Sequence, residues 1–228
     1  MNPDPIARYL QRLPTFVTFF FSIMLVSVFN KLSTLFNWSA GPSFDIRNLS
    51  HDLIIVGFVA TLFFVVSVWL SFALLIERFP YTLDYTVFFF DVARFSLLFI
   101  IFNYSFLAGT PPYYGYYLGA LGIFHLMMAG WHTYRMRSIQ GEERAERAED
   151  IRGHLLRMGT YFVLGIIYYV FVAIPWQASK PMGLHAAIVI VTSGLVVYWN
   201  ARRLVEMKAK ARHAQEAAKA QLAPEPVR

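Results

Sequence analysis

The chain has 228 residues, of which 57% are hydrophobic and 15% are charged, and it carries a net charge of +6 and no cysteine. Soluble domains usually contain about 45–50% apolar and about 25% charged residues, so this composition excludes an ordinary soluble domain. The lack of cysteine excludes disulfides, thiol catalysis and iron–sulfur clusters held by cysteine. Six apolar blocks of roughly 18 or more residues are long enough to cross a bilayer as helices. The sequence therefore predicts an all-α polytopic membrane protein, a bundle of six transmembrane helices.

The predicted spans follow one another with short polar breaks. The first covers about residues 13–36 and begins beside Pro14, a residue suited to the first turn of a helix. It is longer than the apolar core of a secretory signal, which measures about 7–15 residues, so we expect a retained anchor. The other five spans are expected at about residues 53–76, 85–108, 114–134, 155–176 and 182–199.

Positive charge is distributed unevenly between the predicted loops. Lys and Arg gather on the cytoplasmic side of short loops. If the N-terminus is cytoplasmic, that side carries sixteen of the 20 basic residues, whereas the outer side carries only Lys31, Arg47 and Lys180. We therefore expect a protein of the bacterial cytoplasmic (inner) membrane with both termini in the cytoplasm. Because the basic residues flank helix ends, they indicate an asymmetric membrane surface and no nucleic-acid partner.

Two segments outside the spans are rich in charge. Residues 1–200 form the predicted transmembrane domain, and residues 201–228 form a cytoplasmic tail whose Ala, Lys, Arg and Glu favour a helix that continues the sixth span. The segment 135–152 mixes both signs and is expected to be a solvated helical connector. Either this loop or the tail is a candidate docking site for a cytoplasmic protein, beside the lipid bilayer itself and further copies of the chain as partners.

The third span contains two charged residues. Asp91 and Arg94 are spaced i, i+3, so they share one helix face and lie within reach of each other. A charge near the bilayer centre costs about 2.5–3.5 kcal/mol on insertion scales. One interpretation is a site for a solute, ion or proton; the other is a self-neutralising pair that fixes helix packing or an oligomer interface. The sequence leaves both interpretations open.

The histidines suggest a second kind of site. His125 lies in the middle of the fourth span, His132 lies two turns further on the same face, and His185 begins the sixth span. A b-type haem would require His125 and His185 to face each other at the same depth. A histidine hydrogen-bonded to a neighbouring helix is favoured over that alternative, and we expect no cofactor and no metal. His154 is assigned to the membrane interface, where solvation explains it.

Two tyrosines of the fifth span lie deep enough that their hydroxyl groups need partners. We expect Tyr161 and Tyr168 to join the charged pair. The predicted polar centre consists of Asp91, Arg94, Tyr161, Tyr168 and His125.

Small residues recur along the fourth span. Gly115, Gly119 and Gly122 allow helices to approach closely where lipid supplies no hydrophobic drive. Packing within the chain is the favoured interpretation, and dimerisation through this face is the alternative.

No catalytic signature runs through the chain: a phosphate-binding loop, a zinc-protease helix and a serine nucleophile elbow are all missing from the sequence. The leading hypothesis is a small oligomeric carrier or channel for an ion, proton or small solute. The alternative is a non-transporting membrane subunit, such as an assembly factor, sensor or effector. A membrane enzyme or b-type haem protein is the third hypothesis.

Overall fold

The structure is a computed structural model that describes residues 49–78, 85–138 and 142–222, together with residues 19, 22, 23, 26, 27, 30 and 33. The described residues form helices joined by short turns, with no strand among them. The all-α prediction is confirmed for this part of the chain. The predicted first span, residues 13–36, lies outside the described residues except for these seven positions, so it stays a prediction.

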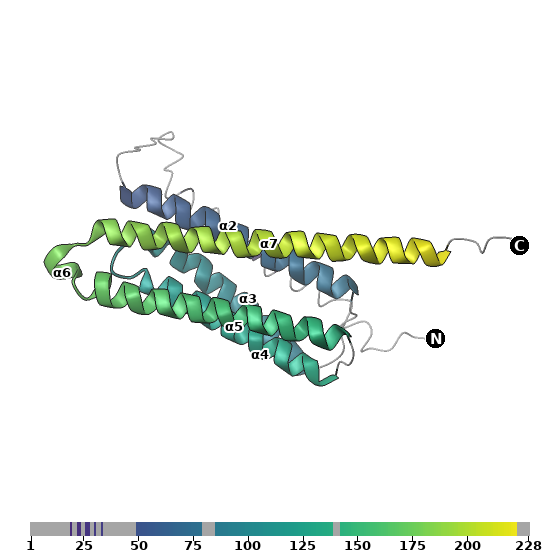
Figure 1. Cartoon of the computed structure of the whole chain (residues 1–228). Coiled ribbons are helices and arrows are strands. Elements are labelled where there is room, and N and C mark those ends of the chain that lie inside the picture. Colours follow the sequence, from purple (N-terminus) through teal and green to yellow (C-terminus); the bar gives the residue numbers. More distant parts are fainter. Residues whose placement is uncertain are drawn as a thin grey trace, which may run out of the picture.

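Five long helices build the described bundle (Figure 1). They are α2 (Leu49–Arg78), α3 (Tyr85–Ser105), α4 (Gly115–Arg135), α5 (Glu142–Tyr168) and α7 (Met182–Leu222). The short elements are the 3-10 turns η1 (Phe106–Gly109) and η2 (Met136–Ser138), the π-helical turn η3 (Tyr169–Ala173) and α6 (Trp176–Ser179).

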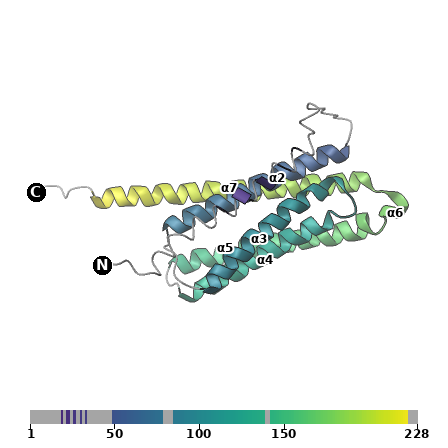
Figure 2. The ribbon, with the colours of Figure 1, turned by 180° about the vertical axis from the view of Figure 1, so that it is seen from behind.

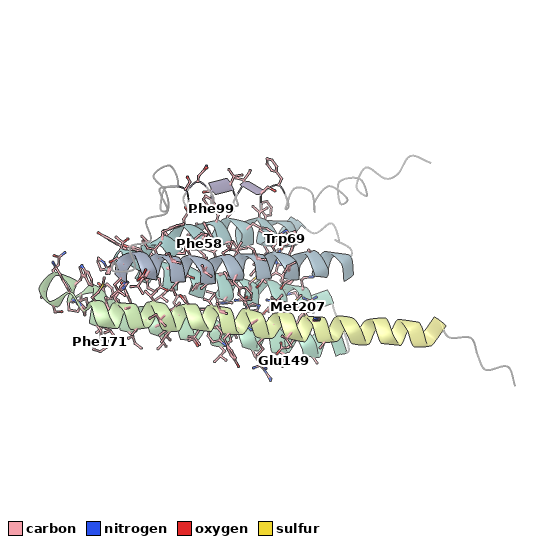
Figure 3. All side chains as sticks on the ribbon, turned by 90° about the horizontal axis from the view of Figure 1, so that it is seen from above. Phe58, Trp69, Phe99, Glu149, Phe171 and Met207 are labelled. Carbon is pink, nitrogen blue, oxygen red and sulfur yellow. The ribbon has the colours of Figure 1, made fainter. Side chains whose placement is uncertain are left out.

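Consecutive long helices run in opposite directions, so the connections gather at the two ends of the bundle (Figures 1 and 2). We call the end that carries α6 the α6 end. The opposite end carries η2 and the part of α7 that projects beyond the other helices, and we call it the tail end. Figure 3 shows Phe171 near the α6 end, with Glu149 and Met207 towards the tail end.

Four helices are long and apolar enough to cross a membrane. Their candidate spans are Asp52–Ala73, Phe89–Gly109, Arg147–Ala173 and Met182–Ala209. They correspond to the predicted second, third, fifth and sixth spans. The fifth begins eight residues before the predicted residue 155, because the charged segment continues the same helix without a break.

The predicted fourth span is a helix, α4, but it does not belong to these four. Its histidines and tyrosines lower its mean hydropathy. Eleven of its 21 residues are buried, and it packs against both α3 and α5. A helix surrounded by other helices can carry polar side chains that a helix at the surface of a membrane protein cannot. Of the six predicted apolar spans, four are therefore found among the described residues.

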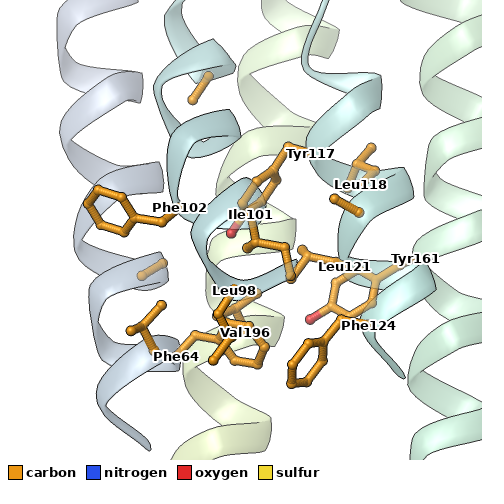
Figure 4. Packing of buried hydrophobic residues seen from close by; sticks show 14 of the residues in the cluster. Phe64, Leu98, Ile101, Phe102, Tyr117, Leu118, Leu121, Phe124, Tyr161 and Val196 are labelled. Carbon is orange, nitrogen blue, oxygen red and sulfur yellow. The ribbon is translucent and has the colours of Figure 1, made fainter. Parts of the chain in front are cut away.

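The core is aromatic and draws on all five long helices (Figure 4). Phe64 of α2 meets Phe124 of α4 edge to face at 5.1 Å between ring centroids, a favourable aromatic geometry. Helix α2 also packs on η1 through Gly57, where an added Cβ would lie 3.0 Å from Cβ of Ala108. These contacts fix α2 against α4 and η1.

The two charge-rich segments are both helical. Helix α5 begins at Glu142, so most of the predicted solvated connector 135–152 forms the first turns of α5. The prediction that this connector is solvated is wrong at Arg147, which is buried. Helix α7 continues unbroken from Met182 to Leu222, beyond the predicted end of the sixth span at residue 199.

Candidate functional site

The charged pair of α3 forms the predicted contact. Arg94 Nη2 lies 3.2 Å from Asp91 Oδ1, and both side chains are buried. The guanidinium also lies over the rings of Phe72 and Phe95, at 4.4 and 4.9 Å from their centroids. The candidate span begins at Phe89, so the pair lies in its first two turns and not near its centre. The cost of burying charge is lower there than at the centre of a bilayer.

Arg94 also lines a cavity of about 60 Å³ at the tail end, which we call the tail-end cavity. Helices α2, α3, α4, α5 and α7 all contribute to its wall. The polar residues of its lining are Ser71, Arg94, Trp131, His132, Arg147, Asp150 and Arg203. Three guanidinium groups and one carboxylate therefore share one small space.

The hydrogen bond between Arg147 and His132 determines the tautomer of this histidine. Arg147 Nη1 lies 3.4 Å from His132 Nδ1. A guanidinium can only donate, so Nδ1 is the acceptor and the ring proton is on Nε2. His132 Nε2 and Trp131 Nε1 are both buried, and neither has a hydrogen-bond partner among the described residues. Both atoms are donors, and both belong to residues that line the tail-end cavity.

A stack of three histidine rings leads from the cavity into the bundle. His154 lies between His132 and His125, with ring centroids 5.3 and 5.2 Å away. The ring of Tyr161 continues the stack on His125 at 5.5 Å and is almost parallel to it. The assignment of His154 to a solvated interface is wrong, because the residue is only 2% exposed.

Within this stack, His125 and His154 share a hydrogen bond of 2.9 Å between their Nδ1 atoms. One ring must donate and the other must accept, since a neutral imidazole carries one proton. Either ring can be the donor in this geometry, and the acceptor ring then carries its proton on Nε2. The bond therefore has two possible arrangements, which differ in the tautomer of both rings.

A different polar cluster occupies the α6 end. His185 Nε2 donates to the carbonyl oxygen of Ala108 at 2.7 Å, because a carbonyl can only accept. His185 Nδ1 is then the acceptor for the hydroxyl group of Tyr168 at 3.0 Å. Both ring nitrogens are thus held by fixed partners. We call Ala108, Tyr168 and His185 the His185 lock.

The lock separates Tyr168 from the charged pair that it was expected to join. Asp91 precedes Ala108 by 17 residues, which corresponds to roughly 25 Å along a helix. The structure therefore brings Tyr168 to the α6 end and leaves Asp91 near the tail end. Of the predicted polar centre, His125 and Tyr161 lie together in the stack, and Asp91 and Arg94 lie together beside the cavity.

The same geometry excludes His125 and His185 as a pair of haem ligands. The ring of His185 contacts Tyr114, and Tyr114 precedes His125 by 11 residues, or about 16 Å, along α4. Both nitrogens of His185 already have protein partners. The partner of His125 is His154. Among the described residues, no group of three or more His, Asp or Glu side chains is arranged to hold a metal ion.

Two of the three predicted packing glycines of α4 face α5. A Cβ at Gly122 would lie 2.9 Å from the ring of Phe162, and one at Gly115 would lie 3.5 Å from the ring of Tyr168. Nothing lies within 4 Å of such a Cβ at Gly119. Close packing between α4 and α5 thus uses Gly115 and Gly122.

Sequence reasoning missed Arg147 and His154, although α5 carries a signal for both. Its buried residues include Arg147, His154, Tyr161 and Tyr168, which recur at every seventh position. We call these four residues the α5 stripe. A seven-residue repeat places its members on one face of a helix, and here that face meets α4.

The described residues thus define an all-helical protein with four helices that are long and apolar enough to cross a membrane. No known protein family matches the chain, and neither a curated protein nor a solved structure matches it.

Proposed function

We propose that the chain is an integral membrane protein that carries protons, or a small ion accompanied by protons, along the α5 stripe and the histidine stack. The observation that carries this proposal is the inverted polarity of α5. Its buried face is the polar stripe, whereas its exposed face is apolar, with Leu156 and Ile166 66% and 64% exposed. Water-soluble proteins bury apolar side chains and do not expose them in long rows, so this inversion fits a lipid environment.

The length of the α5 stripe fits a path across the membrane. Arg147 and Tyr168 are 21 residues apart, or about 31 Å along the helix axis. The hydrocarbon core of a bilayer is about 30 Å thick. Titratable side chains buried within a membrane bundle commonly mark proton relays and ion pathways. The stripe therefore supports a route with one end at the tail-end cavity.

The chemistry of the route favours protons over larger solutes. Histidine can both accept and donate a proton near neutral pH. When an additional proton reaches His125 and His154, one ring is an imidazolium and the other an imidazole, so the bridging proton can pass between the two Nδ1 atoms without forming an imidazolate. A cavity of about 60 Å³ has room for only a few water molecules. Six spans, cytoplasmic termini, the bacterial inner membrane and a homo-oligomer belong to the same proposal.

Proton flux into liposomes tests this function. The purified full chain is reconstituted, and an entrapped pH-sensitive dye reports the response to an imposed potassium-diffusion potential. His154→Phe preserves a ring in the stack but removes the proton carrier, so we expect flux to fall at least tenfold. Tyr169→Phe changes an exposed residue of the adjoining turn and should keep wild-type flux.

Wild-type liposomes that acidify no faster than empty ones would contradict the proposal. So would full flux through His154→Phe, provided that circular dichroism and size-exclusion chromatography show equal folding of the two proteins.

A second function, as a non-transporting membrane subunit, is favoured by one observation. Helix α7 projects beyond the bundle at the tail end (Figures 1 and 2). If its projecting part binds a partner, removal of the residues after Lys208 should abolish association with that partner. The bundle should stay folded, because the truncation removes only Ala209 from the candidate spans. A proton carrier should instead keep its flux after this truncation.

A further inference from the structure

We propose that the tail-end cavity binds a phosphate-type anion, either free phosphate or the phosphate of a lipid headgroup. The proposal goes beyond proton transfer and does not depend on it. The cavity, its charge and its free donors carry the inference, and each is a feature of described residues.

The charges of the lining favour an anion. Arg94, Arg147 and Arg203 contribute three positive charges, and Asp150 contributes one negative charge. Asp91 adds a second carboxylate through its contact with Arg94. Glu206 also acts on Arg203, so carboxylates offset part of this charge. Guanidinium groups that line one small cavity repel one another, so an anionic ligand would stabilise this arrangement.

The hydrogen-bonding groups of the cavity are mainly donors. Guanidinium groups and indole nitrogens only donate, and His132 Nε2 carries a proton in the tautomer that Arg147 imposes. The buried Nε2 of His132 and Nε1 of Trp131 have no partner among the described residues. Both residues are 3% exposed or less. A ligand with several acceptor oxygens would satisfy these donors.

The size and position of the cavity select the class of anion. About 60 Å³ corresponds to room for about four to six groups of the size of water, at roughly 10–15 Å³ each. One phosphate group fits this volume, whereas a nucleotide does not. The side chain of Asp150 is 48% exposed, so the cavity reaches the surface of the tail end. A phosphate oxyanion also suits arginine, whose planar fork can bind two oxygens at once.

The experiment measures thermal unfolding of the purified full chain in a neutral detergent. Inorganic phosphate is added against chloride at equal ionic strength, and phosphatidylcholine nanodiscs with and without phosphatidic acid supply the lipid arm. At 100 times the dissociation constant, we expect the midpoint to rise by about 5 °C or more. A rise with inorganic phosphate identifies free phosphate as a ligand. A rise with phosphatidic acid alone identifies the lipid headgroup.

Two matched pairs of variants locate the site. Arg203→Gln and Arg147→Gln remove charges from the cavity and should abolish the shift. Arg202→Gln and Arg152→Gln make the same change at exposed arginines of the same helices and should retain it. Should the cavity variants fold poorly, Arg203→Lys keeps the charge without the fork and should reduce the shift by at least half.

The proposal is overturned if neither phosphate nor phosphatidic acid stabilises the wild-type chain beyond its chloride or phosphatidylcholine control. It is also overturned if the shift persists unchanged in both Arg147→Gln and Arg203→Gln.

Discussion

The two ends of the bundle use the same residue types for different purposes. At the α6 end, His185 lies between a carbonyl that can only accept and a tyrosine hydroxyl that donates, so its tautomer is fixed. Towards the tail end, His125 is bonded to another histidine, and the proton can belong to either ring. The chemical nature of the partner decides whether the tautomer of a buried histidine is fixed or can change.

The two clusters also differ in how far their buried polar groups are satisfied by protein atoms. The His185 lock satisfies both ring nitrogens with protein atoms, as buried polar groups usually require. The tail end instead combines three arginines, a cavity and two buried donors without partners among the described residues. We therefore assign structural stability to the lock and ligand chemistry to the tail end, and the following changes test this division.

Breaking the charged pair should have the largest effect. Arg94→Leu leaves the carboxylate of Asp91 buried without its partner and should lower the free energy of unfolding by about 3–5 kcal/mol. The double variant with Asp91→Asn and Arg94→Gln should recover most of this loss. The free energies of unfolding of both variants are measured in a mild detergent to which increasing amounts of a denaturing detergent are added. If the double variant is stable and retains full flux, the pair is a packing device and not part of the site.

Breaking the lock should have a smaller effect on stability. His185→Leu leaves the carbonyl of Ala108 and the hydroxyl group of Tyr168 without their partner, at a cost of about 1–3 kcal/mol in the free energy of unfolding. Tyr168→Phe removes one bond and should cost about 1 kcal/mol. Flux per folded molecule should equal that of the wild type in His185→Leu, whereas Tyr168→Phe also removes the last hydroxyl group of the α5 stripe and should lower the flux. A specific loss of flux in His185→Leu would show that the lock belongs to the transport route.

Substitutions at the interface between α4 and α5, which runs between the two ends of the bundle, should have the smallest effect on stability. Gly122→Ala pushes a methyl group against the ring of Phe162 and should cost about 1 kcal/mol, since this partly exposed ring can move outward. Gly119→Ala meets nothing and should be neutral or slightly stabilising, because alanine favours a helix more than glycine does. The same unfolding assay compares them. Equal losses in both variants would mean that a partner, such as a second copy, covers Gly119.

Local features of the sequence predicted much of this structure. Apolar blocks indicated α2, α3 and α7, since a long row of apolar residues needs no knowledge of its neighbours. The contact between Asp91 and Arg94 follows from helical spacing alone. The fifth span was predicted to begin at residue 155 because the charged residues before it indicate a separate solvated helical connector, although their seven-residue repeat continues through His154 to Tyr168.

Contacts between helices were beyond such reasoning. That His154 meets His125, and that Arg203 reaches the cavity, depends on which helices are neighbours and on how each is rotated. No local pattern encodes that information in a single sequence. The prediction that Tyr168 joins Asp91 was wrong for the same reason, because it depends on which end of the bundle each of the two residues occupies.

The unbroken length of α7 gives the molecule the mechanics of a lever. His185 holds one end of the helix, Arg203 follows about 27 Å further on, and Leu222 lies roughly 55 Å from His185. The pivot of this lever lies beyond Arg203, because Ser71 of α2 still contacts Met207 four residues further on. A force applied to the projecting tip therefore acts first on the contact between α2 and α7 beside the wall of the cavity.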